Sequence, residues 1–469
     1  MPRHPRLDAL AQTETAPEVV AAISELIERG ADGELARINV LRFAEERKLS
    51  PDRTIDGFVH ATRLGLFEMV WNVSCPQCGD VLERAHTAKQ VRSEPYGCIK
   101  CVAAYEPTLD EQVEVAFTVS ATVRKIAAHS PVTLSVPEYF RLFSFGPRLD
   151  VPRGGPEFDA TFQELSPAMG RVAPHQTQTL RLEAKAGMAM LFDAVSHYTG
   201  VLYVEGEPTQ SLQTVPVVMA GDRQRDEFHA RPGPLELRVE NRLGDDAVLA
   251  LHVLDERTMA RLAITRPFLT AKRLFTNQTF RNLYRTEALD FGQRLKIERM
   301  TILFTDLKGS TELYERVGDL AAFELVQKHF AVLEQVARAQ GGSVVKTIGD
   351  AVMASFPSAT QGFDAALQMR TAIDAFNSMR GGEDVLIKIG LHQGPCLAVL
   401  LNDRLDYFGQ TVNIAARVQG LAEAQAICTT TAVLEDAQVA PLLSERGLAP
   451  RPRRAALKGI RDEVTVYDL

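Results

Sequence analysis

The 469-residue chain lacks the features that would indicate a membrane protein, a secreted protein or a nucleic-acid-binding protein. No apolar run approaches the roughly 20 residues that a helix needs to span a bilayer. The N-terminus carries two arginines and a histidine but no apolar core of a signal peptide. The net charge is −8, so overall charge gives no support to nucleic-acid binding. We therefore expect a cytoplasmic protein with no transmembrane segment and no nucleic-acid partner.

The chain also lacks internal repeats and low-complexity tracts, and its length suggests about three domains. Hydrophobic residues make up 45% of it, which is ample for globular cores. We expect an α+β multidomain protein built from five segments. These are a helical segment (1–73), a four-cysteine element (74–105), a β-rich regulatory domain (106–261), a helical linker (262–298) and an α/β domain (299–469).

Three amphipathic stretches predict helices in the first segment, over residues 17–30, 35–47 and 52–69. They suit either a winged-helix-like bundle or a plain structural segment. No helix rich in lysine and arginine stands out as a recognition helix.

Cysteine is scarce, with six in the chain, and four of these form two Cys-x₂-Cys pairs. Cys75 pairs with Cys78 and Cys98 with Cys101, and nineteen residues separate the pairs. This spacing falls in the range of four-cysteine zinc ribbons. Two disulfides are the alternative, which a cytoplasmic location disfavours. A site of four thiolates leaves no open coordination position, so we predict a structural Zn²⁺.

The β-rich segment is predicted from period-two alternation. Residues 113–119 alternate, and so do residues 235–240, which we expect to form a hairpin with residues 247–253. Residues 188–192 and 201–204 are further strand candidates. We expect a small antiparallel sandwich, without visible ligand-binding residues.

Residues 270–284, in the linker, predict a helix with basic and aromatic character. Such a helix either packs between domains or contacts a membrane or partner. Its position suits the transfer of a signal to the last domain. We expect the N-terminal half to respond to a regulator, whose identity the sequence leaves open.

The stretch after the linker carries the first chemical signal. An apolar run over residues 301–303 predicts a buried strand over residues 299–305, and Asp306 follows it at the start of a turn that opens a helix. The N-terminus of a helix favours phosphate, and a neighbouring carboxylate can hold a cation that the phosphate shares. The alternative is that Ser310 or Thr311 caps the helix and Asp306 is a solvated turn residue.

A second carboxylate, Asp350, follows Gly349 at the tip of a hairpin predicted over residues 343–356. Two carboxylates at strand ends, near a phosphate-binding turn, suit a two-metal site. Helices predicted over 310–339 and 359–378, and a strand over 385–391, complete the order βααββαβ of a ferredoxin-like core. With these motifs, the chain from about residue 299 to its end resembles the catalytic domain of class III nucleotidyl cyclases.

The resemblance implies a metal and phosphate site. It implies that two Mg²⁺ or Mn²⁺ ions are held by Asp306, Asp350 and the backbone carbonyl of Leu307. The turn residues that it assigns to substrate binding are Gly309, Ser310 and Thr311.

Two further residues match the base-recognition pair of the family, Lys346 and Asp406. Adenylyl members use a lysine with an aspartate or threonine, whereas guanylyl members use a glutamate with a cysteine-like residue. The chemistry agrees, because lysine only donates, which suits a ring nitrogen, and aspartate accepts from the exocyclic amine of adenine. The alternatives are a surface salt bridge for Lys346 and a turn cap for Asp406.

Asn413 and Arg417 lie four residues apart, hence on one face of a helix. The resemblance assigns Asn413 to the ribose and Arg417 to the charge on the α-phosphate. It assigns Lys458 to phosphate binding. Arginines close to Lys458 that could share this task are Arg451, Arg453 and Arg454.

The resemblance therefore implies an adenylate cyclase of intracellular signalling that converts ATP to 3′,5′-cyclic AMP and pyrophosphate. In the family, active sites lie at the interface of a head-to-tail dimer, so one cyclase domain per chain implies a homodimer. A guanylate or dual-specificity cyclase is one alternative. A catalytically silent nucleotide-sensing or dimerisation module is another.

Overall fold

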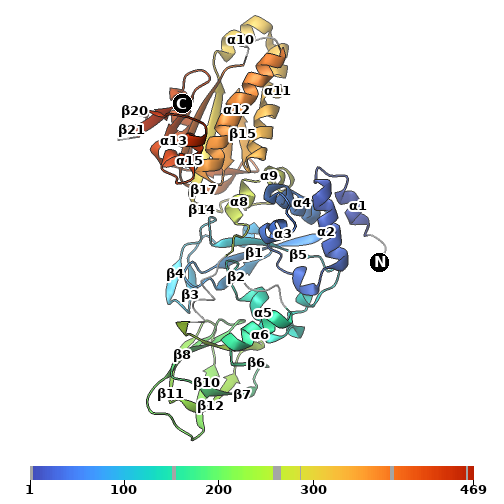
Figure 1. Cartoon of the computed structure of the whole chain (residues 1–469), viewed down its shortest axis with the longest axis vertical. Coiled ribbons are helices and arrows are strands. Elements are labelled where there is room, and N and C mark those ends of the chain that lie inside the picture. The colour runs from blue at the N-terminus through green and yellow to red at the C-terminus, as the bar shows by residue number, and fades with distance from the viewer. Residues whose placement is uncertain (1–3, 150–154, 257–265, 286, 381–384, 461–462) are drawn as a thin grey trace. The chain divides into compact units, whose positions relative to one another are not determined.

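The computed structural model describes residues 4–149, 155–256, 266–285, 287–380, 385–460 and 463–469. Within these ranges the chain forms two compact units, and each is described by itself (Figure 1). The N-terminal unit comprises Met1–Glu106 and Gln112–Leu269, and the C-terminal unit comprises Pro107–Glu111 and Thr270–Leu469. The short segment Pro107–Glu111 thus belongs to the C-terminal unit, although the chain on both sides of it belongs to the N-terminal unit.

The N-terminal unit begins with short helices that pack on a three-stranded sheet. The helices are α1 (Pro5–Leu10), α2 (Pro17–Arg29), α3 (Val40–Glu46) and α4 (Pro51–Arg63), with the 3₁₀ turn η1 (Asp32–Glu34). The strands are β1 (Phe67–Ser74), β2 (Val81–Ala85) and β5 (Val113–Val119), in the order β2-β1-β5. The ring of Phe58 on α4 lies 5.1 Å from both Phe43 on α3 and Phe117 on β5. Aromatic packing therefore joins the helices to the sheet.

Two expectations for this region are wrong. The helix predicted over residues 52–69 ends at Arg63, because Gly65 adopts a φ of +75° and a buried strand begins at Phe67. The boundary expected at residue 73 also fails, because β1 pairs along its length with β5. The sheet therefore joins the N-terminal helices to residues that we had assigned to the β-rich segment.

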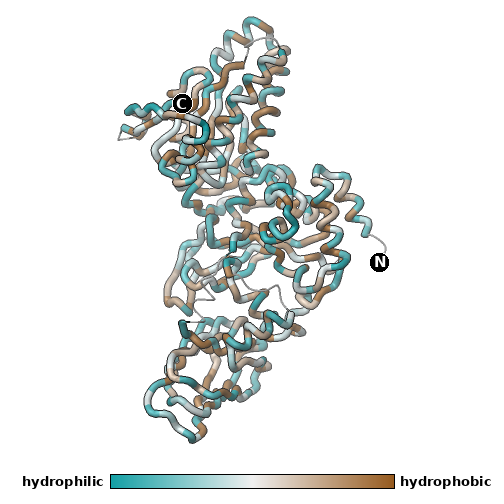
Figure 2. The backbone as a smooth tube through the Cα atoms, viewed as in Figure 1, coloured by the Kyte–Doolittle hydropathy of each residue, from teal (hydrophilic) through white to brown (hydrophobic). Residues whose placement is uncertain are grey.

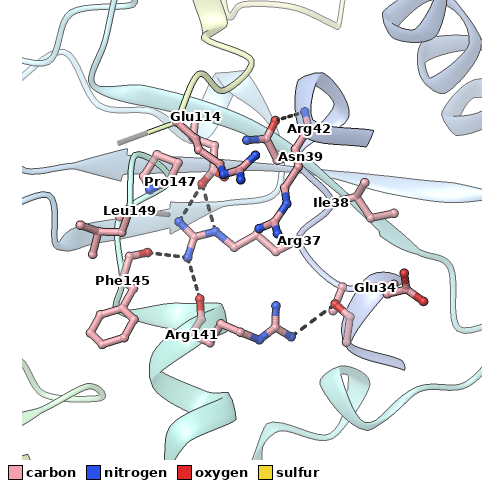
Figure 3. A pocket seen from close by; sticks show the side chains of 14 residues that line it. Glu34, Arg37, Ile38, Asn39, Arg42, Glu114, Arg141, Phe145, Pro147 and Leu149 are labelled. Carbon is pink, nitrogen blue, oxygen red and sulfur yellow. Dashed lines mark hydrogen bonds and ion pairs between the residues drawn. The ribbon is translucent and has the colours of Figure 1, made fainter. Parts of the chain in front are cut away.

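A buried ion pair ties the helices to this sheet, as Figure 3 shows. Nη2 of Arg37 lies 2.8 Å from Oε2 of Glu114 on β5, and Asn72 on β1 donates to the same oxygen at 2.7 Å. Arg37 also donates to the carbonyl of Phe145 at 2.7 Å. The cavity beside it holds about 90 Å³, which is well below the roughly 300 Å³ at which ligand pockets begin. We infer a structural role for this cluster.

Short elements connect the first sheet to the rest of the unit. They are η2 (Ala88–Gln90), β3 (Tyr96–Cys98), β4 (Ala103–Tyr105), η3 (Ala127–His129), η4 (Pro131–Thr133), α5 (Val136–Phe143) and α6 (Pro156–Leu165). Strands β3 and β4 form a small hairpin of their own. An aromatic cluster that includes Phe140 of α5, Phe162 of α6 and Phe192 packs the two helices on the second part of the unit.

Two sheets that share one core form this second part. Their strands are β6 (Ala168–Val172), β7 (Thr177–Ala184), β8 (Gly187–Asp193), β9 (Thr199–Val204), β10 (Gln213–Met219), β11 (Arg225–Ala230), β12 (Gly233–Asn241) and β13 (Ala247–Val253). The sheet orders are β10-β12-β7 and β11-β9-β8-β13-β6. The shared core includes Leu180, Leu202 and Val239. The expected sandwich and the strands near 188–192 and 201–204 are confirmed.

The hairpin predicted for residues 235–240 with 247–253 is wrong. Strand β12 pairs with β7 and β10, whereas β13 pairs with β6 and β8, so the two strands lie in opposite sheets. The buried amide of Asn241 donates to the carbonyls of Val172 and Asp245 at 2.9 and 2.8 Å, where the chain crosses between the sheets. The sandwich is also mixed rather than antiparallel, because β10 runs parallel to β12 and β9 to β11.

The C-terminal unit is built on one sheet that has eight strands among the described residues. The order is β15-β16-β14-β17-β19-β21-β20, with β18 beside β17. The strands are β14 (Leu295–Leu307), β15 (Ser343–Ile348), β16 (Ala351–Phe356), β17 (Ile387–Leu401), β18 (Arg404–Phe408), β19 (Ile427–Thr430), β20 (Arg451–Ala455) and β21 (Val464–Asp468). The helices from β14 onward are α10 (Ser310–Val317), α11 (Asp319–Ala339), α12 (Ala359–Arg380), α13 (Gln410–Leu421), α14 (Thr431–Leu434) and α15 (Val439–Glu445).

The predicted order βααββαβ and the ferredoxin-like α/β core are confirmed. Helices α11 and α12 pack on the sheet through residues such as Leu333 and Phe363. Helix α13 approaches β17 at Gly390, where a Cβ would lie 2.2 Å from the backbone nitrogen of Gln419. Glycine at this position therefore lets α13 lie directly against the sheet.

The linker predicted over residues 262–298 is largely part of the C-terminal unit. Helices α8 (Ala271–Phe275) and α9 (Gln278–Leu283) belong to that unit, and β14 already begins at Leu295. The carboxylate of Asp110 anchors this region, because it accepts from Nζ of Lys272 at 2.7 Å and from the backbone N–H of Glu298 at 2.6 Å. Residues 262–265 of the predicted linker lie outside the described residues.

Helices α11 and α12 are 21 and 22 residues long. Figure 2 shows apolar and polar residues mixed along both, as expected for helices with one face on a sheet and one in water. In the described part of the chain, no helix combines the length and the apolar character needed to cross a membrane.

Candidate active site

Two carboxylates lie at the ends of neighbouring strands in the C-terminal unit. Asp306 is the penultimate residue of β14, and residues 300–305 before it are buried. Asp350 lies between β15 and β16, and Gly349 before it has a φ of +63°, which lets the hairpin turn tightly. Because β16 pairs directly with β14, the hairpin tip lies at the same end of the sheet as Asp306.

Electrostatics link the two carboxylates. Burial raises the pKa of Asp306 above its ordinary value, and the negative charge of Asp350 raises it further. Oδ2 of Asp350 is buried and has no hydrogen-bond partner among the described residues. A buried carboxylate oxygen without a partner, beside a second carboxylate, fits a bound divalent cation. The residues present therefore suit the expected Mg²⁺ or Mn²⁺ ions.

The turn after Asp306 opens helix α10. Gly309 is its N-cap residue, in the left-handed conformation with a φ of +69°, and no side chain caps the helix. The alternative in which Ser310 or Thr311 caps the helix is therefore wrong. The backbone N–H groups of the first turn have no side-chain acceptor from a cap, which suits an anion at this position.

Lys346 and Asp406 lie sixty residues apart in the sequence and in direct contact in the structure. Nζ of Lys346 on β15 lies 2.5 Å from Oδ2 of Asp406 on β18. Asp406 is only 6% exposed, and its other oxygen accepts from the backbone N–H of Tyr407 at 2.8 Å. A donor and an acceptor thus lie side by side, partly buried, as recognition of an adenine edge requires.

Helix α13 presents Asn413 and Arg417 on one exposed face. Neither side chain has a hydrogen bond or ion pair among the described residues, so both are available to a ligand. Lys458 is exposed after β20, in a turn with Gly459. Of the nearby arginines, Arg453 is already bound to Asp468, at 2.5 Å.

The structure thus brings the predicted residues together in groups. One group holds Asp306, Asp350 and the turn at Gly309, and another holds Lys346 and Asp406. No hydrogen bond joins Asn413, Arg417 or Lys458 to either group in the described part of the chain. The roles assigned to these residues stay predictions.

The four paired cysteines also come together, in the N-terminal unit. The sulfur atoms of Cys75, Cys78, Cys98 and Cys101 all lie within 4.8 Å of one another. Two of the distances are 3.8 Å (Cys75 to Cys101) and 3.6 Å (Cys78 to Cys98). These distances exceed the roughly 2.05 Å of a disulfide. They match the edge of about 3.8 Å expected for a tetrahedron with Zn–S bonds of about 2.3 Å.

Sequence reasoning missed the buried polar residues next to the ion pair of Lys346 and Asp406. These residues are Gln278, Arg281 and Tyr407. The available signal was an arginine between aromatic and apolar residues in a short helix, which we assigned to a linker. His392, by contrast, is explained structurally, because its Nδ1 lies 2.8 Å from Oγ1 of Thr430 and burial lowers its pKa to about 4.

Two known families match different parts of the chain. Residues 3–282 match a family of unknown function, DUF5939, and residues 293–467 match the adenylate and guanylate cyclase catalytic domain. An adenylate cyclase of Anabaena cylindrica is 30% identical over 186 residues, which cover 36% of each chain. Adenylate cyclase 2 of Rhizobium meliloti is 34% identical over 136 residues, or 26% of this chain and 37% of that protein. The chain thus spans little more than a third of these curated relatives.

Solved structures also align with the C-terminal unit. The adenylyl cyclase CyaB from P. aeruginosa is 22% identical with a TM-score of 0.33, over 38% of this chain and 95% of that one. The guanylate cyclase domain of RhGC from Catenaria anguillulae, in complex with GTP, is 23% identical with a TM-score of 0.33, over 37% and 96%.

The raised pKa of Asp306 yields a prediction for the metal-free protein. A carboxyl whose pKa is raised on folding favours the fold at low pH and disfavours it once ionised. Asp306→Asn should therefore raise the melting temperature of chelator-treated protein at pH 7.5, and this gain should disappear toward the ordinary aspartate pKa of about 3.9. Calorimetry at both ends of this range measures the difference. Asp403→Asn, at an exposed turn, is the control and should change neither value. A loss of stability at pH 7.5 would contradict the prediction.

Proposed function

This chain belongs to the DUF5939 family and carries an adenylate and guanylate cyclase catalytic domain, and we propose that it is an adenylate cyclase with a regulatory N-terminal half. The reaction converts ATP to 3′,5′-cyclic AMP and pyrophosphate. The contact between Lys346 and Asp406 is the observation that favours ATP over GTP as the substrate. Lysine donates to a ring nitrogen of adenine, and aspartate accepts from its amino group. Guanine presents a carbonyl where adenine has this amino group, so Asp406 would face an acceptor.

The residues of the chain divide the catalytic work. Asp306, Asp350 and the carbonyl of Leu307 hold the divalent cations, which when bound activate the ribose 3′-hydroxyl and neutralise the triphosphate. The N–H groups of the turn at Gly309, Ser310 and Thr311 bind phosphate oxygens. Together these groups orient the 3′-oxygen toward the α-phosphorus.

The remaining residues act on the ribose and on the departing phosphates. Asn413 orients the ribose, and Arg417 and Lys458 neutralise the charge that develops as the 3′-oxygen bonds to the α-phosphorus and pyrophosphate leaves. Arg417 suits this task because its guanidinium stays charged and donates to two oxygens at once. No protein group is assigned as the general base.

The test of the function is product analysis of the purified chain by mass spectrometry, with ATP and GTP in parallel and with Mg²⁺ or Mn²⁺. We expect cyclic AMP from ATP and little cyclic GMP. The double variant Lys346→Glu with Asp406→Cys should lose ATP turnover, by up to about 10⁴-fold for a mismatched buried polar site. Unchanged ATP kinetics in this variant would remove both residues from base recognition. Cyclic GMP as the main product of the unaltered chain would establish the guanylate alternative, and no product would leave a silent module.

We also propose that the enzyme is a homodimer with active sites at the subunit interface. Large apolar side chains are exposed on two elements of the C-terminal unit. Leu320 (76% exposed) and Phe323 (61%) lie on α11, and Phe408 (63%) ends β18, the strand that carries Asp406. Exposed apolar side chains favour a partner that covers them. A two-fold dimer in which each subunit supplies one part of each site accounts for this arrangement.

Complementation tests the shared site. Asp306→Ala and Arg417→Ala should each be nearly inactive, since loss of an arginine that stabilises phosphate charge costs roughly 10³–10⁵ in rate. A mixture should recover activity, because a heterodimer rebuilds one intact site. Full exchange makes half of the dimers mixed, each with one good site of two, so the ceiling is about a quarter of unaltered activity for independent sites. An inactive mixture, despite exchange shown by mass spectrometry, would contradict the shared site.

We further propose that the four-cysteine cluster holds a structural Zn²⁺. The thiol geometry supports it, and a closed set of four thiolates leaves no position for catalysis. One zinc per chain should co-purify, and Cys98→Ser should lose it and destabilise the N-terminal unit, because zinc binding contributes to folding. The control Cys396→Ser alters a lone buried cysteine and should keep the zinc. Reduced protein that contains no zinc by metal analysis would refute the proposal.

A further inference from the structure

Helix α9 precedes the first strand of the cyclase sheet, but it contacts both strands that carry Lys346 and Asp406. Nη2 of Arg281 donates to the carbonyl of Leu405 on β18 at 2.5 Å, next to Asp406 in the chain. On the other strand, the backbone N–H of Val344 on β15 donates to Oε1 of Gln278 at 2.7 Å. Strand β15 pairs only with β16, and β18 only with β17, within the described residues. The helix therefore bridges two strands that do not pair with each other through their backbones and are joined by the ion pair of Lys346 and Asp406.

The side chain of Arg281 is buried, and its guanidinium contacts backbone carbonyls and an aromatic ring. Its side chain is 8% exposed. Nη1 donates to the carbonyl of Phe275 at 3.3 Å, and the hydroxyl of Tyr407 donates to the same carbonyl at 3.1 Å. The guanidinium carbon lies 5.6 Å from the centre of the Tyr407 ring. Leu405 and Tyr407, which flank Asp406, are thus both held by the segment that contains α8 and α9.

The charge of Arg281 also links it to Asp406. Burial lowers the pKa of Arg281, whereas the neighbouring Tyr407 and the carboxylate of Asp406 raise it. A guanidinium stays protonated in proteins, so Arg281 is a buried cation close to the buried carboxylate. Without substrate, Asp406 has two cationic neighbours, Lys346 at 2.5 Å and Arg281. When Lys346 turns to the ring nitrogen of a bound adenine, Arg281 is the cation that stays.

We propose that Arg281 is a positioning residue for adenine recognition, which keeps the carboxylate of Asp406 aimed at the amino group of the base. This inference rests on the proposed adenylate cyclase activity. Arg281 acts through the carbonyl of Leu405 and through its charge, and it does not touch the substrate. Removal of Arg281 therefore weakens the selection of the amino group more than it weakens the phosphate chemistry.

The experiment compares two substrates that differ in that group. ATP carries the amino group, and purine riboside triphosphate lacks it. In the unaltered full-length chain, kcat/KM for ATP should exceed that for the analogue. In Arg281→Gln this preference should fall about tenfold, the scale of one oriented hydrogen bond to a charged group. The fall should lie mainly in KM for ATP. Arg281→Lys keeps the charge but not both carbonyl bonds, and it should give an intermediate preference.

Controls separate positioning from stability. Arg285→Gln, at an exposed arginine on the same segment, should keep the unaltered preference. Melting curves are recorded for each variant, because a purely structural role predicts a lower melting temperature and an equal loss with both substrates. Equal losses in Arg281→Gln would overturn the inference, and if that variant does not fold, equal losses in Arg281→Lys would do so. An unaltered chain that makes no cyclic AMP would overturn the proposed function instead.

Discussion

The carboxylate of Asp406 is buried, and a buried charge is stable only where opposite charge and hydrogen bonds compensate it. Here the compensation comes from two sides. Lys346 reaches it from the hairpin of the cyclase sheet, and Arg281 lies near it on a helix that precedes the first strand of that sheet. Three elements meet at this carboxylate, since Lys346 lies on β15, Asp406 on β18 and Arg281 on α9. The same contacts place a donor and an acceptor side by side.

The other carboxylates follow the opposite logic. Asp306 and Asp350 repel each other, and burial makes this repulsion stronger. Repulsion between two carboxylates destabilises the fold when no ligand is bound. A bound cation removes this repulsion, as expected for a cation-binding site. One unit therefore holds one charge cluster that is balanced within the protein, at Asp406, and one that is not, at Asp306 and Asp350.

The chain passes twice from the N-terminal unit to the C-terminal unit. Pro107–Glu111 follows the four-cysteine region and belongs to the C-terminal unit, where Asp110 binds Lys272 and the start of β14. The chain passes from the N-terminal to the C-terminal unit a second time after Leu269, just before α8 and α9. This second passage leads directly to the segment that contains Arg281.

Local sequence patterns predicted the element order of the C-terminal unit and named its candidate residues, whereas in the N-terminal unit they misplaced a helix end and a hairpin. Asp306 after an apolar run, Gly349 before Asp350, and the four-residue spacing of Asn413 and Arg417 depend on periodicity and turn chemistry, which act over a few residues. Strands β12 and β13 instead pair with partners in opposite sheets, and α9 contacts strands more than sixty residues away in the sequence. Such long-range pairings are decided by which buried polar groups find partners, and only the tertiary structure brings those groups together.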